Sequence, residues 1–373
     1  MTDGSSSRSS SRIPGRGGRR GARGGGRRRR RATAVVAWSA AVLVLLGGSG
    51  LGYVYVKLDG NLRGIDIDRI LGRDRPADVD NGSEDILVLG SDSRAGANAV
   101  YGDDGGGARS DTAMIIHVYP GHRKASVVSV PRDTLIDRPD CAGPGGGTVP
   151  GERLAMFNTA YEVGGAACAV KTVETMSGIR MDYYIEVDFT GFKRLIDELG
   201  GVRITTTRPI DDAKSHLTLA PGTHTLDGEQ ALGLVRTRKS VGDGSDLGRI
   251  ELQQAFVKAL IEQVGRIGLF SSPKKLYDLA DTATRAITPD SRLDSVKELI
   301  GFAGGLKEID TRNLRMITLP VTYDPADPNR VLPIPAGAQQ VWTALKQDKP
   351  IPASATKDSA GDPGEAAGTV VGD

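Results

Sequence analysis

The stretch Asp-Ile-Leu-Val-Leu-Gly-Ser-Asp-Ser-Arg at residues 85–94 joins a short apolar run directly to charged side chains. An apolar run of this length, ending in glycine, predicts a buried strand over 85–90. Asp92 and Arg94 then follow at the carboxyl end of that strand. In open α/β sheets, ligands bind outside the carboxyl ends of strands. The stretch therefore predicts both a buried sheet and a site at one edge of it.

The same arrangement recurs along the chain. A second apolar-rich run, 125–130, leads directly into Arg132 and Asp133, and a third strand candidate covers 113–119. Charges at loop ends are often only solvated or paired for structural reasons, and for any single cluster that alternative stays open. Their repeated position at strand ends favours a shared site. The remaining charged or amide candidates are Arg109, Asp111, Arg236, Arg238, Asp246, Arg249 and Gln253.

The residue types in these clusters point to one chemistry. Arginine presents a planar fork of donors that matches phosphate, and it keeps its charge at any physiological pH. Carboxylates are ligands that Mg²⁺ prefers, because it is a hard cation. Together they predict a site for a phosphorylated substrate, such as a pyrophosphate bridged by a metal.

Strand and helix patterns alternate through the rest of the chain, which predicts an α/β fold. Residues 184–189 alternate between apolar and polar side chains, as a half-buried strand does. Thr190 can cap a following helix that ends at Gly200-Gly201. Other predicted strands are 202–207 and 314–319, and other predicted helices are 153–163, 167–177, 229–234, 249–265, 273–286 and 294–304.

The N-terminal part differs in composition from the body. Residues 1–31 contain eleven Arg and one Asp and so carry a net charge of +10. The whole chain has a net charge of +2, so the remainder carries −8. Such a Gly-, Ser- and Arg-rich segment cannot bury a core, so we expect it to be disordered. Its Arg-Gly stretches are compatible with RNA binding, but the uncharged stretch directly after them favours a membrane, and no nucleic-acid partner is expected.

Residues 32–56 carry no charge and are long enough to cross a bilayer as a helix. Five arginines, Arg27 to Arg31, precede them and mark the cytoplasmic side. We therefore expect a single-pass anchor in the cell membrane, a connector over 57–82 and a catalytic domain outside the cell. A cleaved signal peptide is the alternative, although its apolar region is usually shorter. Residues 348–373 are expected to form a flexible C-terminal tail.

Two cysteines, Cys141 and Cys168, are the only ones in the chain. Outside the cytoplasm disulfides persist, and two cysteines allow one pairing, so we predict a bond between them. Two buried free thiols are the alternative. The spacing does not suit a zinc site.

The ordered motifs resemble one family. Residues 86–94, Arg109-Ser110-Asp111-Thr112 and 127–134 closely resemble the LytR-CpsA-Psr family. The later motifs that resemble it are Asn158-Thr159-Ala160-Tyr161, Asp182-Tyr183-Tyr184, Leu226-Asp227-Gly228-Glu229-Gln230, Val235-Arg236-Thr237-Arg238 and Asp246-Leu247-Gly248-Arg249. Each motif is weak alone, but their order is specific, and the resemblance covers roughly residues 83–340.

The resemblance implies an α/β/α sandwich around a mixed central sheet, with a deep apolar pocket for a polyprenyl tail. It also implies transfer of a glycopolymer from a polyprenyl-pyrophosphate carrier onto peptidoglycan; teichoic acid, capsule and arabinogalactan are polymers of this kind. Hydrolysis of the same pyrophosphate lipid is one alternative. A non-catalytic envelope regulator or lipid-binding module is the other.

By motif match, Asp92 and Asp111 would hold Mg²⁺, with Mn²⁺ as a possible substitute. The residues expected to bind or act on the pyrophosphate are Arg109, Arg132, Arg236, Arg238, Asp246 and Arg249, with Arg94, Asp133 and Gln253 as further substrate-binding residues. Asp246 stands one helical turn before Arg249, so it either orients that arginine or takes the proton of the acceptor hydroxyl. The sequence departs from the family pattern at Leu252, where arginine is frequent.

Overall fold

The computed structural model describes residues 52–91, 110–143, 145–238, 246–266, 272–309 and 311–361, with the backbone of 371–372. The chain divides into two compact units, Met1–Val54 and Tyr55–Asp373, and nearly all described residues belong to the second. The predictions for 1–31 and for most of 32–56 lie outside these residues. Within the described part, no helix combines the length and apolar character needed to span a membrane.

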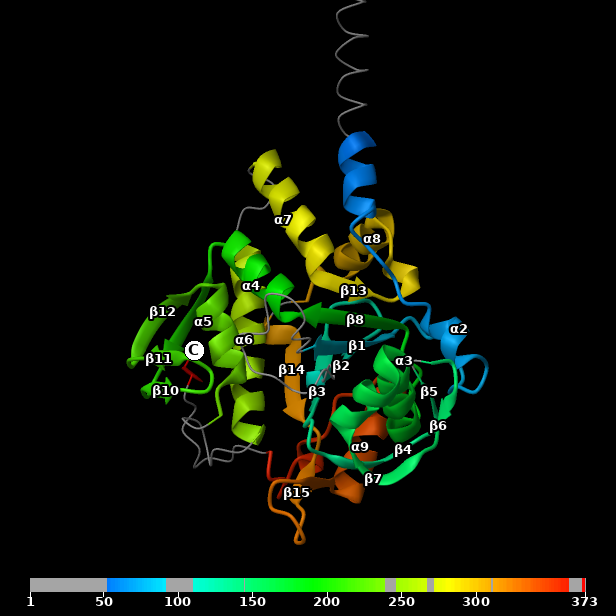
Figure 1. Cartoon of the computed structure of the whole chain (residues 1–373). Helices are drawn as coiled ribbons and strands as arrows, with labels where there is room; N and C mark the ends of the chain where they lie inside the picture. The colour runs from blue at the N-terminus through cyan, green and yellow to red at the C-terminus, as the bar shows by residue number, and fades with distance from the viewer. Residues whose placement is uncertain are drawn as a thin grey trace, which may run out of the picture. The chain divides into compact units, whose positions relative to one another are not determined.

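The core of the second unit is a six-stranded sheet in the order β13-β8-β1-β2-β3-β14. β1 pairs parallel with β8 and antiparallel with β2, and β3 pairs antiparallel with β2 and parallel with β14. Four strands, β8, β1, β3 and β14, therefore run in the same direction and end on one side of the sheet; Figure 1 labels each of them. The strands are β1 (Glu84–Ser91), β2 (Ser110–Val118), β3 (Ala125–Val130), β8 (Tyr183–Asp188), β13 (Ile287–Pro289) and β14 (Leu314–Thr318). The predicted mixed sheet in an α/β fold is confirmed.

Helices pack on both faces of this sheet because its strands alternate apolar residues on each side. Leu87, Ile115 and Val128 are fully buried in a core shared with α3 (Phe157–Ser177) and α9 (Pro335–Lys346). Their neighbours on the other face, including Ile86, share a smaller cluster with α8 (Val296–Leu306).

A second apolar cluster lies beside the sheet, among α4 (Phe189–Glu198), α5 (Gly228–Arg236), α6 (Asp246–Arg266) and β9 (Val202–Thr206). Asp188 caps α4 by accepting from the Gly191 amide, so the helix begins directly where β8 ends. Asp227 and Gln230 form a capping box that starts α5. The end of α5 lies near the end of β8, because Arg236 contacts the ring of Phe189, the residue directly after β8.

The remaining elements surround these cores. They are α2 (Ile67–Leu71), α7 (Pro273–Ala286), β4 (Leu135–Arg138), β5 (Cys141–Ala142), β6 (Thr148–Val149), β7 (Glu152–Met156), β10 (Ile210–Asp212), β11 (Leu217–Leu219), β12 (Gly222–Leu226), β15 (Val321–Tyr323), β16 (Val331–Pro333), β17 (Val371–Gly372) and the short 3₁₀ helices η3 (Ser291–Leu293), η4 (Thr311–Asn313) and η5 (Ala353–Ala355).

Most predicted elements occur, but the region around residue 153 differs. Residues 152–156 pair with β4 as β7, so the predicted helix over 153–163 begins only at Phe157. The two predicted helices are joined as α3 across a kink at Gly164 and Gly165, whose backbone is not helical. A side chain at Gly164 would meet Cys168 Cβ at 2.7 Å, so glycine permits this close approach.

Two segments expected to be independent of the domain are packed onto it. In the predicted connector over 57–82, Ile67 is 2% exposed, and the Arg75 guanidinium pairs with the buried carboxylate of Glu174. In the predicted flexible tail, Ile351 and Ala355 belong to the main core. Isolated apolar residues among polar ones have no periodicity from which this burial could be predicted.

Cys141 and Cys168 form a disulfide, which confirms the predicted pairing. The bond ties β5 to the second half of α3, and both half-cystines are buried with Ala160. It encloses a loop with a sequence separation of 27 residues.

Replacing both cysteines by alanine should lower the free energy of unfolding by about 3–4 kcal/mol, because the bond restricts the unfolded chain. Urea unfolding of the double variant beside the oxidised parent measures this. An unchanged midpoint would contradict the expectation.

Asp182 lies at the sheet edge opposite the charged clusters. Its Oδ2 accepts from the Asp85 amide at 2.7 Å, and its own amide donates to Asp85 O at the same distance. Burial, with the negative charge of Asp85 adding to it, raises the Asp182 pKa to about 6. The folded state therefore binds this proton more tightly than the unfolded state does.

Asp182→Asn should stabilise the protein at pH 7.5 by about 1–3 kcal/mol, because asparagine can accept the same hydrogen bond without a buried charge. As pH falls from 6 towards 4, Asp182 becomes protonated in the folded state. The free-energy cost of burying its negative charge then disappears. The stability difference between variant and parent should shrink accordingly. Urea unfolding at pH 4 and 7.5 tests this, and a difference independent of pH would refute it.

Candidate functional site

The structure brings most predicted site residues together at the carboxyl edge of the sheet. Asp111 is the second residue of β2, Arg132 and Asp133 follow β3, and Asp246 begins α6. The cluster formed by Asp111, Arg132, Asp133, Arg238, Asp246 and Arg249 is called the arginine–aspartate cluster below. Asp92, Arg94 and Arg109 lie outside the described residues, so their predicted roles stay predictions.

Asp246 lies among three arginines. Its Oδ1 is 2.6 Å from Arg249 Nη2, 3.5 Å from Arg132 Nε and 3.8 Å from Arg238 Nε. The Asp246 side chain is 11% exposed, and that of Arg249 only 3%. The contact with Arg249 spans one helical turn, as the sequence spacing indicated. This geometry favours an orienting role for Asp246.

Asp111 joins the same network from the sheet. Arg132 Nη1 donates to its carboxylate, and Arg249 Nη2 donates to its backbone carbonyl at 3.0 Å. Burial alone would raise the pKa of Asp111, but Arg249, Arg132 and Arg238 outweigh it and lower the pKa. Asp111 is therefore held as a carboxylate.

Two other groups have shifted proton affinities. Burial raises the pKa of Asp133, against the opposing charge of Arg132 and with the negative charge of Asp246 adding to the rise. Burial also lowers the pKa of Arg238, and the positive charges of Arg249 and Arg132 act in the same direction. The charged form of Arg238 is therefore disfavoured by its surroundings, and an additional anion bound nearby would stabilise it.

Gln253 anchors α6 rather than extending the charged cluster. Its Nε2 donates to Thr112 Oγ1 at 2.9 Å and to Val235 O at 3.0 Å. Gln253 is 5% exposed, so these contacts satisfy an otherwise buried amide. By bridging β2 and the end of α5, Gln253 holds the two sequence-distant halves of the site together.

Arg236 ends α5 next to this bridge. Its guanidinium carbon lies 5.1 Å from the centre of the Phe189 ring, the first residue of α4. The aromatic face of Phe189 supports the guanidinium of Arg236 and fixes its position at the end of α5. Leu252, at the family's frequent arginine position, is 1% exposed in the second apolar cluster.

Arg330 lies at the site although the sequence did not predict it as a site residue. Its Nη1 lies 3.9 Å from Asp133 Oδ1, and its Nε lies 3.8 Å from Asp327 Oδ2. It reaches the site because Val331 bridges to Thr134, directly after Asp133. Arg330 stands much further along the chain, in a polar turn between two short strands, and no local pattern there indicates this contact.

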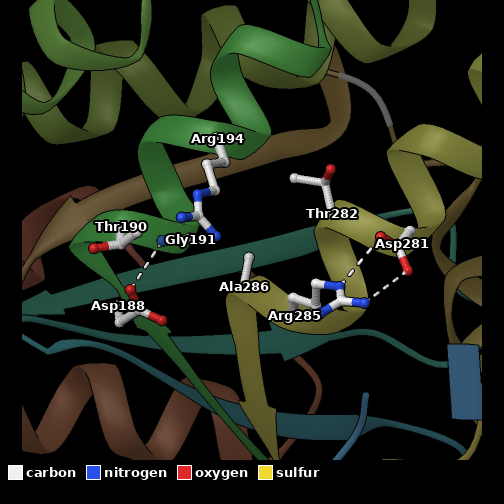
Figure 2. Close-up of a pocket in the computed structure, with 8 residues that line it drawn as sticks. All are labelled: Asp188, Thr190, Gly191, Arg194, Asp281, Thr282, Arg285 and Ala286. Atoms are coloured by element: carbon white, nitrogen blue, oxygen red, sulfur yellow. Dashed lines mark hydrogen bonds and ion pairs between the residues drawn. The ribbon is translucent and has the colours of Figure 1, made fainter. Parts of the chain in front are cut away.

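A polar pocket of about 470 Å³ lies along the same sheet edge, between α4 and α7. Figure 2 shows the Arg194 side chain beside Thr190 and Gly191, while Arg285 binds Asp281 one turn earlier on the same helix, α7. Its lining is mostly charged and polar, as is that of a second pocket between Arg75, Lys171 and Glu174. Neither is the apolar lipid pocket that the resemblance implied, so that pocket stays a prediction.

The cluster is suited to binding an anion. Arg132, Arg238 and Arg249 balance the three carboxylates, and Arg236 and Arg330 add positive charge at its border. Within the described residues, no three His, Cys, Asp or Glu side chains are placed to hold a metal. Arginines held by carboxylates at strand ends, with Arg249 buried behind Arg132 and Arg238, are chemically suited to a phosphorylated ligand.

Comparison with known proteins identifies the family. The model of the LytR_cpsA_psr family matches residues 54–347, and the chain belongs to this family. That match begins well before residue 83, in agreement with the packing of the connector onto the domain.

Two relatives and one solved structure illustrate the similarity. Cell wall biosynthesis protein LcpA of Corynebacterium glutamicum is 33% identical over 76% of this chain, and the chain covers 58% of its length. TagT of Bacillus subtilis, a polyisoprenyl-teichoic acid–peptidoglycan teichoic acid transferase, is 31% identical over 74% of this chain and is covered to 82%. A structure of TagT bound to LI-WTA has a TM-score of 0.54 at 27% identity, covering 76% of this chain and 98% of that one.

Proposed function

We propose that this protein transfers a glycopolymer from a polyprenyl-pyrophosphate lipid to peptidoglycan. The observation that carries the proposal is the convergence of Arg132, Arg238 and Arg249 on the largely buried Asp246 carboxylate, with Arg132 also bound to that of Asp111. The names of relatives support the substrate class: TagT is a polyisoprenyl-teichoic acid–peptidoglycan transferase, and LcpA is a cell wall biosynthesis protein.

The proposed reaction exchanges one phosphate ester for another. An acceptor hydroxyl oxygen attacks the phosphorus attached to the glycopolymer, and the bond from that phosphorus to the bridging oxygen breaks. Polyprenyl phosphate leaves with the bonding electron pair, and the hydroxyl proton passes to a base or to water. The products are a phosphodiester between glycopolymer and peptidoglycan, and polyprenyl phosphate.

The arginines would supply most of the positioning and charge stabilisation in this reaction. Phosphoryl transfer depends mainly on positioning and on stabilising charge, and needs no covalent protein nucleophile. Arg132 and Arg238, which are more exposed than Arg249, would contact the phosphate oxygens directly. Asp246, which is itself paired with the buried Arg249, would hold those two arginines in place.

A divalent cation is part of the proposal. The donor chemistry fits one, because Asp111 remains ionised and Mg²⁺ commonly takes only one or two protein carboxylates, with water and phosphate oxygens completing its shell. Asp111 and Asp92 would hold Mg²⁺, or Mn²⁺ in its place, and the ion would neutralise charge on the pyrophosphate. The surrounding arginines would orient the phosphates independently of it.

The proposed location is the outer face of the cell membrane. The uncharged stretch 32–56 would be the anchor, and the five preceding arginines would keep the N-terminus in the cytoplasm. This location gives the site access both to a lipid-linked substrate and to peptidoglycan.

The test is incubation of the full chain in lipid vesicles with a radiolabelled polyprenyl-pyrophosphate glycan, Mg²⁺ and peptidoglycan. The proposal predicts label on peptidoglycan and its loss on chelation of the cation. Release of soluble glycan phosphate would instead indicate a hydrolase. Binding of lipid without turnover would indicate a lipid-binding module.

A further inference from the structure

Helix α8 carries an uncharged segment from which one large apolar side chain, Ile300, projects. Its segment from Leu299 to Leu306 reads Leu-Ile-Gly-Phe-Ala-Gly-Gly-Leu and contains no charged side chain. Ile300 is 68% exposed, and a Cβ added at Gly301 or Gly304 would meet nothing within 4 Å. Lys297 and Lys307 lie near its two ends, each next to a glutamate, Glu298 and Glu308, and Lys297 is 3.6 Å from Glu298. An uncharged segment with an outward apolar side chain and lysines near its ends can lie in a membrane interface, where apolar side chains enter the lipid and lysines reach the headgroups.

Packing within the domain uses only part of α8. Val296 is buried, and Phe302 and Leu306 contact the apolar cluster under the outer face of the sheet. The Phe302 ring lies 5.2 Å from that of Tyr183. These contacts fix α8 on the domain and leave Ile300 facing outward, so its exposure is not explained by packing.

The described start of the domain is hydrogen-bonded to the start of α8. Asp59 Oδ1 accepts from the Val296 amide at 3.0 Å. The same segment contacts α7, where Asn61 Nδ2 donates to Asp281 Oδ1 at 3.1 Å and to Thr284 Oγ1 at 3.0 Å. The chain that enters the domain at residue 55 is therefore held against both helices.

This contact limits how far α8 can lie from Val56, the last residue of the predicted membrane span. That span ends at Val56, three residues before Asp59, and residues 55–59 are helical. At 1.5 Å per residue, the helix rises only about 4.5 Å over this distance. Tyr55 and Val56, at 44% and 69% exposure, and Leu276 of α7, at 39%, are further exposed apolar side chains on the two segments that meet here.

We propose that α8 lies on the outer surface of the bilayer, with Ile300 inserted among the lipids and Lys297 and Lys307 at the headgroups. The inference rests on the membrane anchor of the proposed function and goes beyond it, because the anchor alone does not determine how the domain is oriented. Two attachments, the anchor and α8, fix one face of the domain against the membrane. The end of the sheet that carries the arginine–aspartate cluster is then held in one orientation relative to substrate in the membrane.

The test uses the full chain in vesicles that contain phosphatidylglycerol. Because Cys141 and Cys168 are bonded, Ile300→Cys supplies a single free thiol for the fluorophore NBD. Lipids spin-labelled on their acyl chains should quench this fluorescence severalfold. Leu154→Cys is the matched control, since Leu154 is 60% exposed on β7, at the opposite end of the domain from α8 (Figure 1). Its fluorescence should be unaffected.

The outcomes separate this inference from its premise. Failure of the chain to float with vesicles would overturn both the anchor and the membrane contact of α8. Flotation without quenching at Ile300 would overturn the contact alone, and a blue-shifted but unquenched label would show that protein, such as a second copy, covers α8. Ile300→Asp should lower transfer severalfold with substrate in vesicles but leave it unchanged with substrate in detergent.

Discussion

Replacement of Arg132 by alanine is expected to lower the transfer rate by about 10²–10³-fold, the usual effect of removing one donor that stabilises developing charge. The Arg132 guanidinium contacts Asp111 and lies 3.5 Å from Asp246, so it is positioned by both halves of the site. Its side chain is only 20% exposed within this ion-pair network, so the rate is measured under conditions in which the variant is shown to be folded. Release of labelled glycan from the lipid measures the rate.

Two companion variants make this prediction specific. Arg132→Lys should restore activity only partly, because lysine lacks the bidentate fork of donors. Arg203→Ala removes an exposed arginine of β9, away from the cluster, and should leave the rate unchanged. Full activity in Arg132→Ala would show that this arginine is structural.

Replacement of Asp246 by alanine should cost about 3–5 kcal/mol of folding stability, as expected when one partner of a buried ion pair is removed. Arg249 would remain buried without its closest carboxylate, and three arginines would face one another. Chemical unfolding gives the stability, and the transfer assay is run well below the unfolding midpoint. Stability equal to that of the parent would contradict the ion-pair account.

Asp246→Asn separates orientation from proton transfer. Asparagine can still accept from Arg249 but cannot readily take up a proton. If Asp246 only orients the arginine, transfer should fall by less than about tenfold, because a neutral acceptor keeps the geometry with weaker bonds. Loss of transfer with unchanged lipid binding and fold would instead assign the base role to Asp246.

The sheet was predictable because its strands are short apolar runs with charges at their ends. The strands predicted at 85–90, 125–130 and 184–189 appear as β1, β3 and β8. The helix predicted from residue 153 began too early, since pairing of Glu152–Met156 with β4 is a long-range contact that local periodicity does not reveal. Burial of Ile351 in the main core depends on tertiary packing in the same way.

The site was predictable wherever a charge followed a strand or stood at a helical spacing. Arg132 and Asp246 met these conditions, and the structure brings them together. Arg330 met neither, because its position depends on the bridge between Val331 and Thr134. The support of Arg236 by Phe189 also required the fold, since the two residues are far apart in sequence.

The central claim is that the arginine–aspartate cluster moves a glycan phosphate to peptidoglycan. The most direct measurement is phosphorus NMR of peptidoglycan fragments, after digestion of material treated with the full chain and a lipid-linked glycan. We expect a new phosphodiester resonance, and the amount of phosphodiester should equal the amount of polyprenyl phosphate formed. The resonance should be lost with the Arg132→Ala variant. Polyprenyl phosphate formed without that resonance, or a resonance that persists in Arg132→Ala, would contradict the claim.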